Sequence, residues 1–394
     1  MVPAMSMERT ELRGALLSGM YRVGGCIGVG GTGIVFEARR ERDGAMLVVK
    51  TLRPKFAHNA DLVTRLKREA EVAQTVFHPG IVPVLDHGLL SDGSPFLVLK
   101  RLYGESLSRL QRRLGPLPVS ETAVITMRVA SILHAVHQAG YVHRDVKPEH
   151  IILDRNRLGE LEVALLDFGV CASATAPRDE RERERGRVYG TPTYVSPEQA
   201  CGNPDVNAGA DLFGLGVTVF ELLSGEVPFR ASDVTQLLRR IIKEDAPRVS
   251  LRAHHAYGPM DEVVAKLLQR DPRARFPSAR ALTRALTPLV VDRVAAERRL
   301  ANALNVGTGT QEGKVTLQES VAAARGGRRR APDLAATTRA WSGSARTSRS
   351  LPPSSARTWT RSSGAPLRSC PVRSSRPARR WRRSAPRPSR PAWS

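Results

Sequence analysis

The sequence predicts an α+β fold in which a strand-rich N-terminal part precedes a larger, mostly helical part. Residues 21–53 alternate between strand-like apolar runs and turns, with a glycine cluster between the first two strands. Apolar residues in 60–77 and 120–140 recur with helical spacing, and an apolar helix is expected through 211–223. Because strands come first and helices follow, the order of elements favours the α+β class.

The net charge of +23 comes mainly from the C-terminal part of the chain. From residue 306 onward, 19 Lys and Arg stand against 3 Asp and Glu, and Arg, Ser, Pro and Ala dominate. This composition cannot bury enough apolar surface to fold, so residues 306–394 are predicted to be a disordered basic tail. Residues 1–20 are expected to be a short leader, and 291–305 a polar helix.

The basic tail leaves three interpretations open. Arg with interspersed Trp can bind nucleic acid or an anionic membrane through charge and stacking. The composition of the tail is also typical of GC-rich DNA translated out of frame. A flexible tail without a partner is the interpretation favoured here. Nucleic acid is therefore not expected as a partner.

Cysteine usage and hydropathy indicate a cytoplasmic protein. The four Cys are scattered without C-x-x-C spacing, which argues against a zinc site or a disulfide framework. Cys171 as a redox sensor is the minor alternative. No apolar run approaches the ~18–20 residues of a membrane span, and charged residues between Glu8 and Arg13 occupy the place of a signal-peptide core.

Residues 28–35 form a glycine-rich motif, G-x-G-x-x-G-x-V. Glycine lets the backbone approach phosphate groups closely and expose N–H groups to them. The same glycine spacing opens dinucleotide-binding Rossmann units, in which a helix follows the turn. Here strand-like segments follow, so a phosphate-covering loop between two strands is favoured.

Lys50 ends the apolar run 46–49, and two interpretations of it are open: a lysine that extends to solvent, or a phosphate-binding lysine. Helix 60–77 favours the second. Glu69 falls on the helix face that carries Leu62 and Leu66, whereas Glu71 points away. A carboxylate on a buried face needs a cationic partner, and Lys50 is the expected one.

The polar loop 143–150 carries the groups that phosphoryl transfer requires. Asp145 can accept a proton from a hydroxyl group, and Lys147 can stand beside it as a fixed positive charge. Asp167, in the Asp-Phe-Gly sequence that follows soon after, offers oxygen to a hard cation. Phosphoryl transfer depends on positioning, metal and charge neutralisation, so these residues predict a phosphotransferase.

The strings HRDVKP and DFG, in this order, resemble the signatures of the bacterial Hanks-type serine/threonine protein kinases. The glycine loop, the Lys50–Glu69 pair, the GTPTYVSPE string and the DPRAR motif agree with that resemblance. It implies ATP and Mg²⁺, or Mn²⁺, as cofactors and Ser or Thr of proteins as substrates. It also implies a bilobal fold, with a five-stranded antiparallel sheet and one main helix in the N-lobe.

The resemblance implies that the kinase domain covers 21–290, with the N-lobe at 21–99, a hinge at 100–102 and the C-lobe at 103–290. Catalytic roles fall to Asp145, Lys147, Lys50 and Glu69. The residues implied at ATP are Gly28, Val29, Gly30, Gly31, Thr32, Gly33, Val35, Val48, Lys50, Leu99, Lys100, Leu102 and Leu153. Metal ligands are expected at Asp167 and His150.

Two positions depart from the family pattern. His150 stands where the family has Asn, and Val48 where it usually has Ala. These departures motivate the alternative of a pseudokinase, which keeps the fold as a binding or scaffold module.

The activation segment, residues 170–195, contains the charged run 178–187. Between 178 and 188 it has no Ser, Thr or Tyr. The resemblance implies that Arg144 receives an activation-loop phosphate. Glu182 or Glu184 is expected to offer Arg144 a carboxylate instead, and Arg275 is expected to pair with Glu198.

Overall fold

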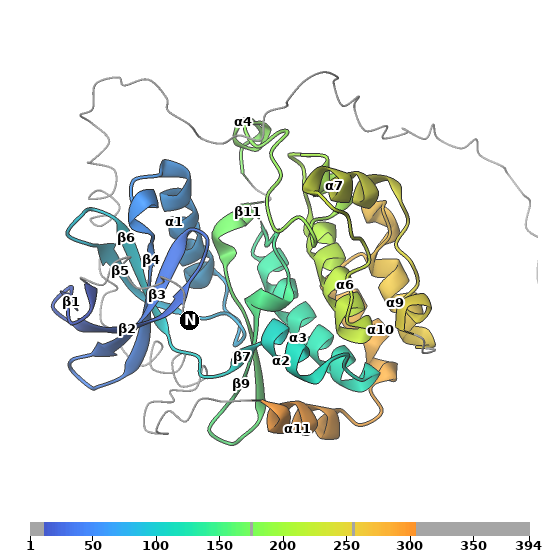
Figure 1. Cartoon of the computed structure of the whole chain (residues 1–394), viewed down its shortest axis with the longest axis horizontal. Helices are drawn as coiled ribbons and strands as arrows, with labels where there is room; N and C mark the ends of the chain where they lie inside the picture. Colours follow the sequence, from blue (N-terminus) through green and yellow to red (C-terminus); the bar gives the residue numbers. More distant parts are fainter. Residues whose placement is uncertain (1–11, 174–175, 254–256, 305–394) are drawn as a thin grey trace, which may run out of the picture. The chain divides into compact units, whose positions relative to one another are not determined.

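The computed structural model describes residues 12–173, 176–253 and 257–304. The predicted tail, 306–394, lies outside the described residues, as do residues 1–11 of the predicted leader. Figure 1 shows a curled N-terminal sheet with α1 next to it, and the helices of the later part grouped together. The α+β arrangement of two lobes is therefore confirmed.

One antiparallel sheet forms the N-lobe. Its strands are β1 (Leu16–Leu17), β2 (Tyr21–Val29), β3 (Gly33–Arg40), β4 (Met46–Leu52), β5 (Val84–Leu89) and β6 (Pro95–Lys100). They are hydrogen-bonded in the order β1-β2-β3-β4-β6-β5. Because strand side chains alternate between faces, Ile34 and Phe36 of β3 reach the same buried cluster as Val49 of β4.

This sheet has six strands in the described residues, whereas the sequence predicted five. The additional strand, β1, comes from the predicted leader, and its Leu17 pairs with Tyr21 of β2. Leu12 and Leu17 are buried in the same cluster as Tyr21. Residues 12–20 therefore belong to the N-lobe. A two-residue strand is too short to show the alternation by which strands are predicted.

The main helix of the N-lobe is α1 (Ala60–Thr75). It begins where the side chain of Asn59 accepts a hydrogen bond from the backbone N–H of Leu62 at 3.1 Å. Its buried residues include Leu66 and Glu69, and the helix packs against β5, β6 and the turn Phe168–Val170. The predicted buried carboxylate is thus confirmed.

The C-lobe is mostly helical and is built around α3 and α6. Its helices are α2 (Leu107–Leu114), α3 (Val119–Gln138), α5 (Pro197–Ala200), α6 (Ala208–Ser224), α7 (Val234–Lys243), α8 (Ser250–Ala253), α9 (Pro259–Leu267) and α10 (Ala279–Leu286). Nearly all of α6 is buried. A Cβ on Gly216 would lie 2.7 Å from the Leu267 Cβ, so glycine is needed where α6 meets α9.

Among the described residues, five short strands lie in the C-lobe near the polar loop 143–150, which is called the catalytic loop from here on. Three of them, β7 (Glu105–Ser106), β9 (Ile151–Arg155) and β10 (Leu161–Leu165), form a small antiparallel sheet. Two more, β8 (Tyr141–Val142) and β11 (Ala172–Ser173), pair on either side of the catalytic loop in the sequence. The activation segment then forms the short helix α4 (Arg178–Glu182).

Helix α11 (Arg293–Ala303) lies within the segment predicted to be a polar helix, 291–305. It packs against α3 and the β9–β10 hairpin, as Figure 1 shows. Ala296, Leu300 and Leu304 are buried in the main C-lobe cluster. The C-lobe therefore continues to Leu304 in the described residues, beyond the predicted boundary at 290.

Candidate active site

The glycine-rich loop connects two strands, as predicted. Val29 of β2 pairs with Ile34 of β3, and the N–H of Gly30 donates to the carbonyl of Gly33 at 2.8 Å to close the turn. A strand follows this turn, so the Rossmann alternative is excluded. A Cβ built on Gly28 or Gly31 would meet no protein atom within 4 Å. Packing within the protein therefore gives no reason for glycine at these two positions.

Lys50 is held between two carboxylates. Its Nζ lies 2.8 and 2.7 Å from the two Oε atoms of Glu69, and 3.6 Å from Oδ1 of Asp167. Burial alone lowers the pKa of Lys50, but the charges of Glu69 and Asp167 raise it well above its usual value. Lys50 in turn holds the pKa of Asp167 well below its usual range. The lysine is charged, and its position is fixed by α1.

The catalytic loop brings Asp145 and Lys147 together. Lys147 Nζ lies 2.9 Å from Oδ2 of Asp145, and the backbone N–H of Thr191 donates to Oδ1 at 2.7 Å. Lys147 also donates to the Thr191 hydroxyl. Burial raises the pKa of Asp145, but His150, Lys147 and the bond from Thr191 together lower it. Asp145 is therefore an ionised, oriented acceptor.

His150 lies between Asp145 and Asp167. Its Nδ1 is 2.9 Å from the carbonyl oxygen of Asp145, which can only accept a hydrogen bond, so Nδ1 carries the proton. In the neutral ring Nε2 then has a free electron pair, and it lies 3.5 Å from Oδ2 of Asp167. Burial lowers the pKa of His150 against the opposing effect of both carboxylates, so the neutral form is favoured. A nitrogen lone pair and a carboxylate thus face one another.

Buried Asp211 of α6 fixes the backbone of the catalytic loop. Its carboxylate accepts the N–H groups of His143 at 2.8 Å and Arg144 at 2.7 Å. His137 Nε2 is 2.7 Å from the same carboxylate. His137 thereby helps to orient the carboxylate that holds the backbone of residues 143–144. Arg144 and Asp167 adopt left-handed backbone angles, φ 69° and 66°, so both positions need such support.

His143 has a structural role. It is buried, and the N–H of Asp145 donates to its Nδ1 at 3.2 Å. Its Nε2 donates to the carbonyl of Leu166 at 3.1 Å, and its ring packs edge-on against Phe168, with centroids 4.9 Å apart. The ring thus joins the catalytic loop to the Asp-Phe-Gly turn, and both nitrogens are occupied.

Several apolar residues that were predicted at ATP lie together in one cluster. Val48 of β4 pairs with Leu99 of β6, and both belong to an apolar cluster that includes Leu102. Leu153 is 0% exposed and lies in the C-lobe core, so it does not reach this cluster. Its neighbour Ile152 does, because successive side chains of β9 point to opposite faces. Of these two neighbours, Ile152 and not Leu153 lies beside Val48 and Leu99, and a contact of either residue with ATP stays a prediction.

Two predicted pairs beyond the reacting groups are present. Arg275 binds Glu198 through two bonds of 2.7 and 2.8 Å, and its side chain is fully buried. Arg144 Nη1 donates to Glu184 Oε2 at 2.7 Å, whereas Glu182 pairs with Arg185 on the surface. Of the two glutamates considered from sequence, Glu184 is the partner of Arg144.

The site is not a preformed metal cage. Among the described residues, no group of three or more His, Cys, Asp and Glu side chains converges to hold a metal ion. Asp167 and His150 supply two ligands at most, so any metal here would need further ligands from a bound substrate. Cys171 is fully buried and burial raises its pKa, which argues against a redox sensor.

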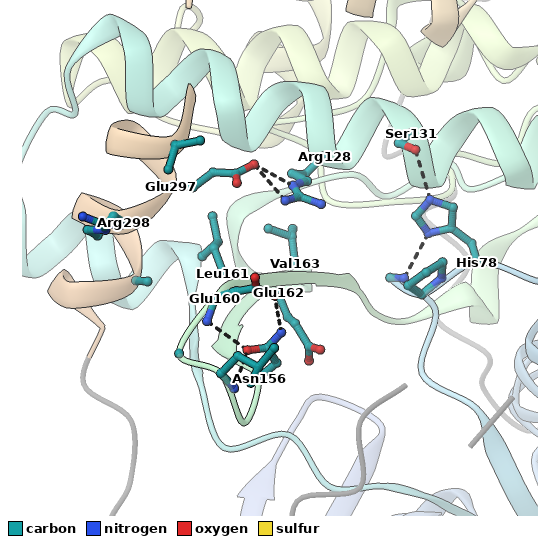
Figure 2. Close-up of a pocket in the computed structure, with 16 residues that line it drawn as sticks. His78, Arg128, Ser131, Asn156, Glu160, Leu161, Glu162, Val163, Glu297 and Arg298 are labelled. Carbon is teal, nitrogen blue, oxygen red and sulfur yellow. Dashed lines mark hydrogen bonds and ion pairs between the residues drawn. The ribbon is translucent and has the colours of Figure 1, made fainter. Parts of the chain in front are cut away.

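A separate pocket of about 700 Å³ lies among α3, the β9–β10 hairpin and α11 (Figure 2). Several of its charged and polar side chains pair with one another. Arg128 Nη2 lies 2.8 Å from Glu297 Oε1, and His78 Nε2 lies 3.1 Å from the Ser131 hydroxyl. None of the residues predicted for catalysis, ATP or metal lines this pocket.

The protein kinase domain model matches residues 21–286. The chain belongs to the protein kinase family. Serine/threonine-protein kinase pkn3 of Myxococcus xanthus is 33% identical over 301 residues, which cover 75% of this chain and 55% of that protein. PkaA of Streptomyces coelicolor is 35% identical over 272 residues, covering 66% and 48%. PknD of Mycobacterium tuberculosis is 33% identical over 262 residues, covering 66% and 38%.

These comparisons confirm the resemblance to bacterial serine/threonine kinases and the fold that it implied. The chain spans about half the length of the curated relatives it matches, or less. Within the described residues of this kinase, only α3 is long and apolar enough to cross a membrane, and 61% of that stretch is buried inside the fold. Helix α3 is therefore a core helix of the C-lobe.

Proposed function

We propose that this chain is an ATP-dependent serine/threonine protein kinase. The observation that carries the proposal is the arrangement of Asp145, Lys147 and Thr191 next to the Lys50–Glu69–Asp167 set. The site contains an ionised carboxylate at Asp145 and two cations, Lys147 and Lys50. Asp167 adds a second carboxylate that can bind a metal ion. This combination supplies proton acceptance, charge neutralisation and positioning, which are the requirements of phosphoryl transfer.

Each residue has a separate role in the proposed reaction. ATP, when bound, supplies the γ-phosphoryl group. Asp145 orients the substrate hydroxyl and accepts its proton, for which its two oxygens are already directed by Thr191 and Lys147. Lys147 can exchange its contact with Thr191 for a contact with the transferring group. Lys50, held by Glu69, stabilises phosphate charge.

The glycine loop and the apolar cluster fit ATP. The open space in front of Gly28 and Gly31 suits close approach of phosphate oxygens to backbone N–H groups. Val48, Leu99 and Leu102 offer an apolar wall to the adenine. The hinge 100–102 begins at Lys100, the last residue of β6, which suits hydrogen bonds between the adenine edge and backbone atoms. Val48, at the position where the family usually has Ala, packs against this cluster and adds two methyl groups to the proposed wall.

Asp167 and His150 fit a divalent cation. Asp167 is ionised and 45% exposed, so it can still accept a ligand. The Nε2 lone pair of His150 faces the same carboxylate at 3.5 Å. Mg²⁺ prefers oxygen ligands, whereas imidazole suits softer divalent ions such as Mn²⁺. We infer that Asp167 holds one metal ion well and that the position shared with His150 favours Mn²⁺ over Mg²⁺.

Serine and threonine are the proposed acceptor residues. The relatives named above are all called serine/threonine kinases. Lys147 donates to the hydroxyl of Thr191, which lies next to Asp145. The protein substrates themselves are not specified by this site. A cytoplasmic location is proposed with it, because ATP is cytoplasmic and because Cys171, buried without a partner cysteine, requires no oxidising compartment.

The deciding experiment measures phosphate transfer by the full-length chain. Wild type should transfer ³²P from ATP to itself and to casein with Mg²⁺ or Mn²⁺. Asp145→Asn should lower kcat by about 10²–10⁴-fold, because a positioned proton acceptor is lost. Its thermal unfolding and ATP binding should match wild type. A wild type that binds ATP without transferring phosphate would favour the pseudokinase alternative, and equal rates in both proteins would contradict the role of Asp145.

A further inference from the structure

Arg144, which immediately precedes Asp145, carries a buried charge that one side chain neutralises. The Arg144 side chain is 3% exposed, and its Nη1 donates to Glu184 of the activation segment at 2.7 Å. In the described part of the chain, its buried Nε has no hydrogen-bond partner. A buried guanidinium is costly without an anion nearby, so the position of Glu184 matters to the catalytic loop.

The ring of Tyr189 packs against the guanidinium of Arg144. The Cζ atoms of Arg144 and Arg65 each lie 5.5 Å from the centre of the Tyr189 ring, which is the distance of a cation–π contact. Gln199 of α5 donates to the carbonyls of both Arg144 and Tyr189, at 2.9 and 3.1 Å. The end of the activation segment is thereby joined to the catalytic loop at the backbone as well.

Arg65 extends this connection to α1. It lies one helical turn before Glu69, the residue that holds Lys50. The neighbouring turn of α1 makes a second connection, since Arg68 Nη1 donates to the carbonyl of Cys171 at 2.9 Å. The activation segment therefore contacts α1 at two places, through Cys171 near the start of the segment and through Tyr189 near the end of the segment.

We propose that Glu184 and Tyr189 are positioning residues that hold the activation segment against the catalytic loop and α1 without a phosphate group. This inference rests on the proposed kinase function and concerns regulation of the same site. Residues 178–188 contain no Ser, Thr or Tyr, so no hydroxyl next to Glu184 in the sequence can take a phosphate. Glu184 gives Arg144 a permanent negative charge. The Tyr189 ring lies against the same guanidinium, which has only one carboxylate partner among the described residues.

The test uses the full-length chain, co-expressed with a phosphatase and shown by mass spectrometry to carry no phosphate. Initial rates with ATP and casein give kcat and KM for wild type, Glu184→Gln and Tyr189→Leu. The matched control is Glu182→Gln, which removes a carboxylate from the same charged run but only breaks the surface pair with Arg185. Tyr189→Phe keeps the ring and should restore most of the activity lost in Tyr189→Leu.

Unphosphorylated wild type should be active in its first turnovers. Glu184→Gln and Tyr189→Leu should each lower kcat by about tenfold or more with little change in KM for ATP, as for loss of one partner of a buried charge pair. Glu182→Gln should stay within about twofold of wild type, as surface pairs usually do. Thermal unfolding is recorded for every variant. If Glu184→Gln is unfolded at the assay temperature, the kcat of Tyr189→Leu compared with that of Tyr189→Phe tests the inference.

Two results would overturn this inference alone. One is a Glu184→Gln variant as fast as wild type. The other is a wild type that gains activity only after its activation segment becomes phosphorylated. A wild type that transfers no phosphate in either state would instead overturn the proposed function, and this inference with it.

Discussion

His150 is the residue whose chemistry departs furthest from the family pattern. The carbonyl of Asp145 fixes the proton on Nδ1, so the Nε2 lone pair is directed to the side of Asp167. Imidazole nitrogen binds Mn²⁺ more readily than Mg²⁺, because Mg²⁺ prefers oxygen ligands and gives up its bound water reluctantly. His150→Asn should therefore raise the Mg²⁺-supported rate and lower the ratio of the Mn²⁺ rate to the Mg²⁺ rate.

The measurement for His150 is the initial phosphorylation rate at saturating ATP over a concentration series of each metal. His58→Asn, at an exposed position on another segment, is the control for a general effect of losing a histidine. Identical metal ratios in wild type and His150→Asn would show that the ring does not act on the metal.

The residue pair Lys50–Glu69 could be predicted because each partner stands in a recognisable local sequence pattern. Glu69 was identified by helical spacing, and Lys50 by its place after an apolar run. Asp211 and Thr191 were missed as site residues because their partners are distant in the sequence and no periodicity links them. The position of Ile152 was missed for a different reason: a strand changes face with every residue, so an error of one position reverses the assignment.

At the scale of elements, α6 acts on the active site through Asp211 at its first turn. Three hydrogen bonds converge on this buried carboxylate from His137, His143 and Arg144. Asp211→Asn keeps the shape but loses the charge and some acceptor capacity. Bonds to charged groups contribute about 1.5–3 kcal/mol each, so we expect a loss of roughly 2–3 kcal/mol in unfolding free energy and a lower kcat.

The same substitution has a predictable pH dependence. Burial raises the pKa of Asp211, but the bonds from His137 and His143 outweigh it and leave the pKa below its usual value. A carboxyl group whose pKa is lower in the folded state stabilises the fold above its unfolded pKa of about 3.9, and this stabilisation is lost as pH falls through the folded value.

The Tm difference between wild type and Asp211→Asn should therefore keep nearly its full size from pH 7 down to about pH 4, and it should narrow as the pH falls further below the unfolded pKa. Asp233→Asn is the control, because Asn caps the start of α7 about as well as Asp does. A Tm difference that stays constant as the pH is lowered from about 4 to about 2.5 would contradict the assignment of the effect to the ionised carboxylate.

The elements themselves were predictable where the apolar pattern is long. The strands of residues 21–53 and the helices α1, α3 and α6 have periodic apolar faces, and the structure contains all of them. Strand β1 has two residues and α11 has a narrow apolar stripe among charged residues, so neither pattern revealed that the element packs into a core. Tertiary contacts define both elements.

At the scale of the whole molecule, the kinase fold extends beyond the residues that match the family model. The match ends at residue 286, yet α11 places Leu300 in the main C-lobe cluster. Ion pairs reinforce this packing, since Arg128 of α3 binds Glu297 of α11 at 2.8 Å. Helix α11 should therefore unfold together with the C-lobe and not separately.

Leu300→Ala tests this in the full-length chain. Leu300 is 2% exposed, and truncating a buried leucine to alanine typically costs about 2–5 kcal/mol because a cavity remains. Val294 lies on the same helix but is 66% exposed, so Val294→Ala should change the free energy of unfolding by only about 0.5 kcal/mol or less. The two substitutions remove side-chain volume from one helix and differ mainly in burial.

Thermal unfolding of both variants is best followed by far-ultraviolet circular dichroism, because all four Trp lie after residue 340 and outside the described residues. For a domain of this size, each kcal/mol corresponds to roughly 2–4 °C in Tm, so Leu300→Ala should melt about 5–15 °C below wild type and Val294→Ala within about 2 °C of it. One cooperative transition should persist in each variant. If Leu300→Ala melts with wild type, or if a small early transition separates from the main one, α11 does not belong to the cooperative core of the kinase domain.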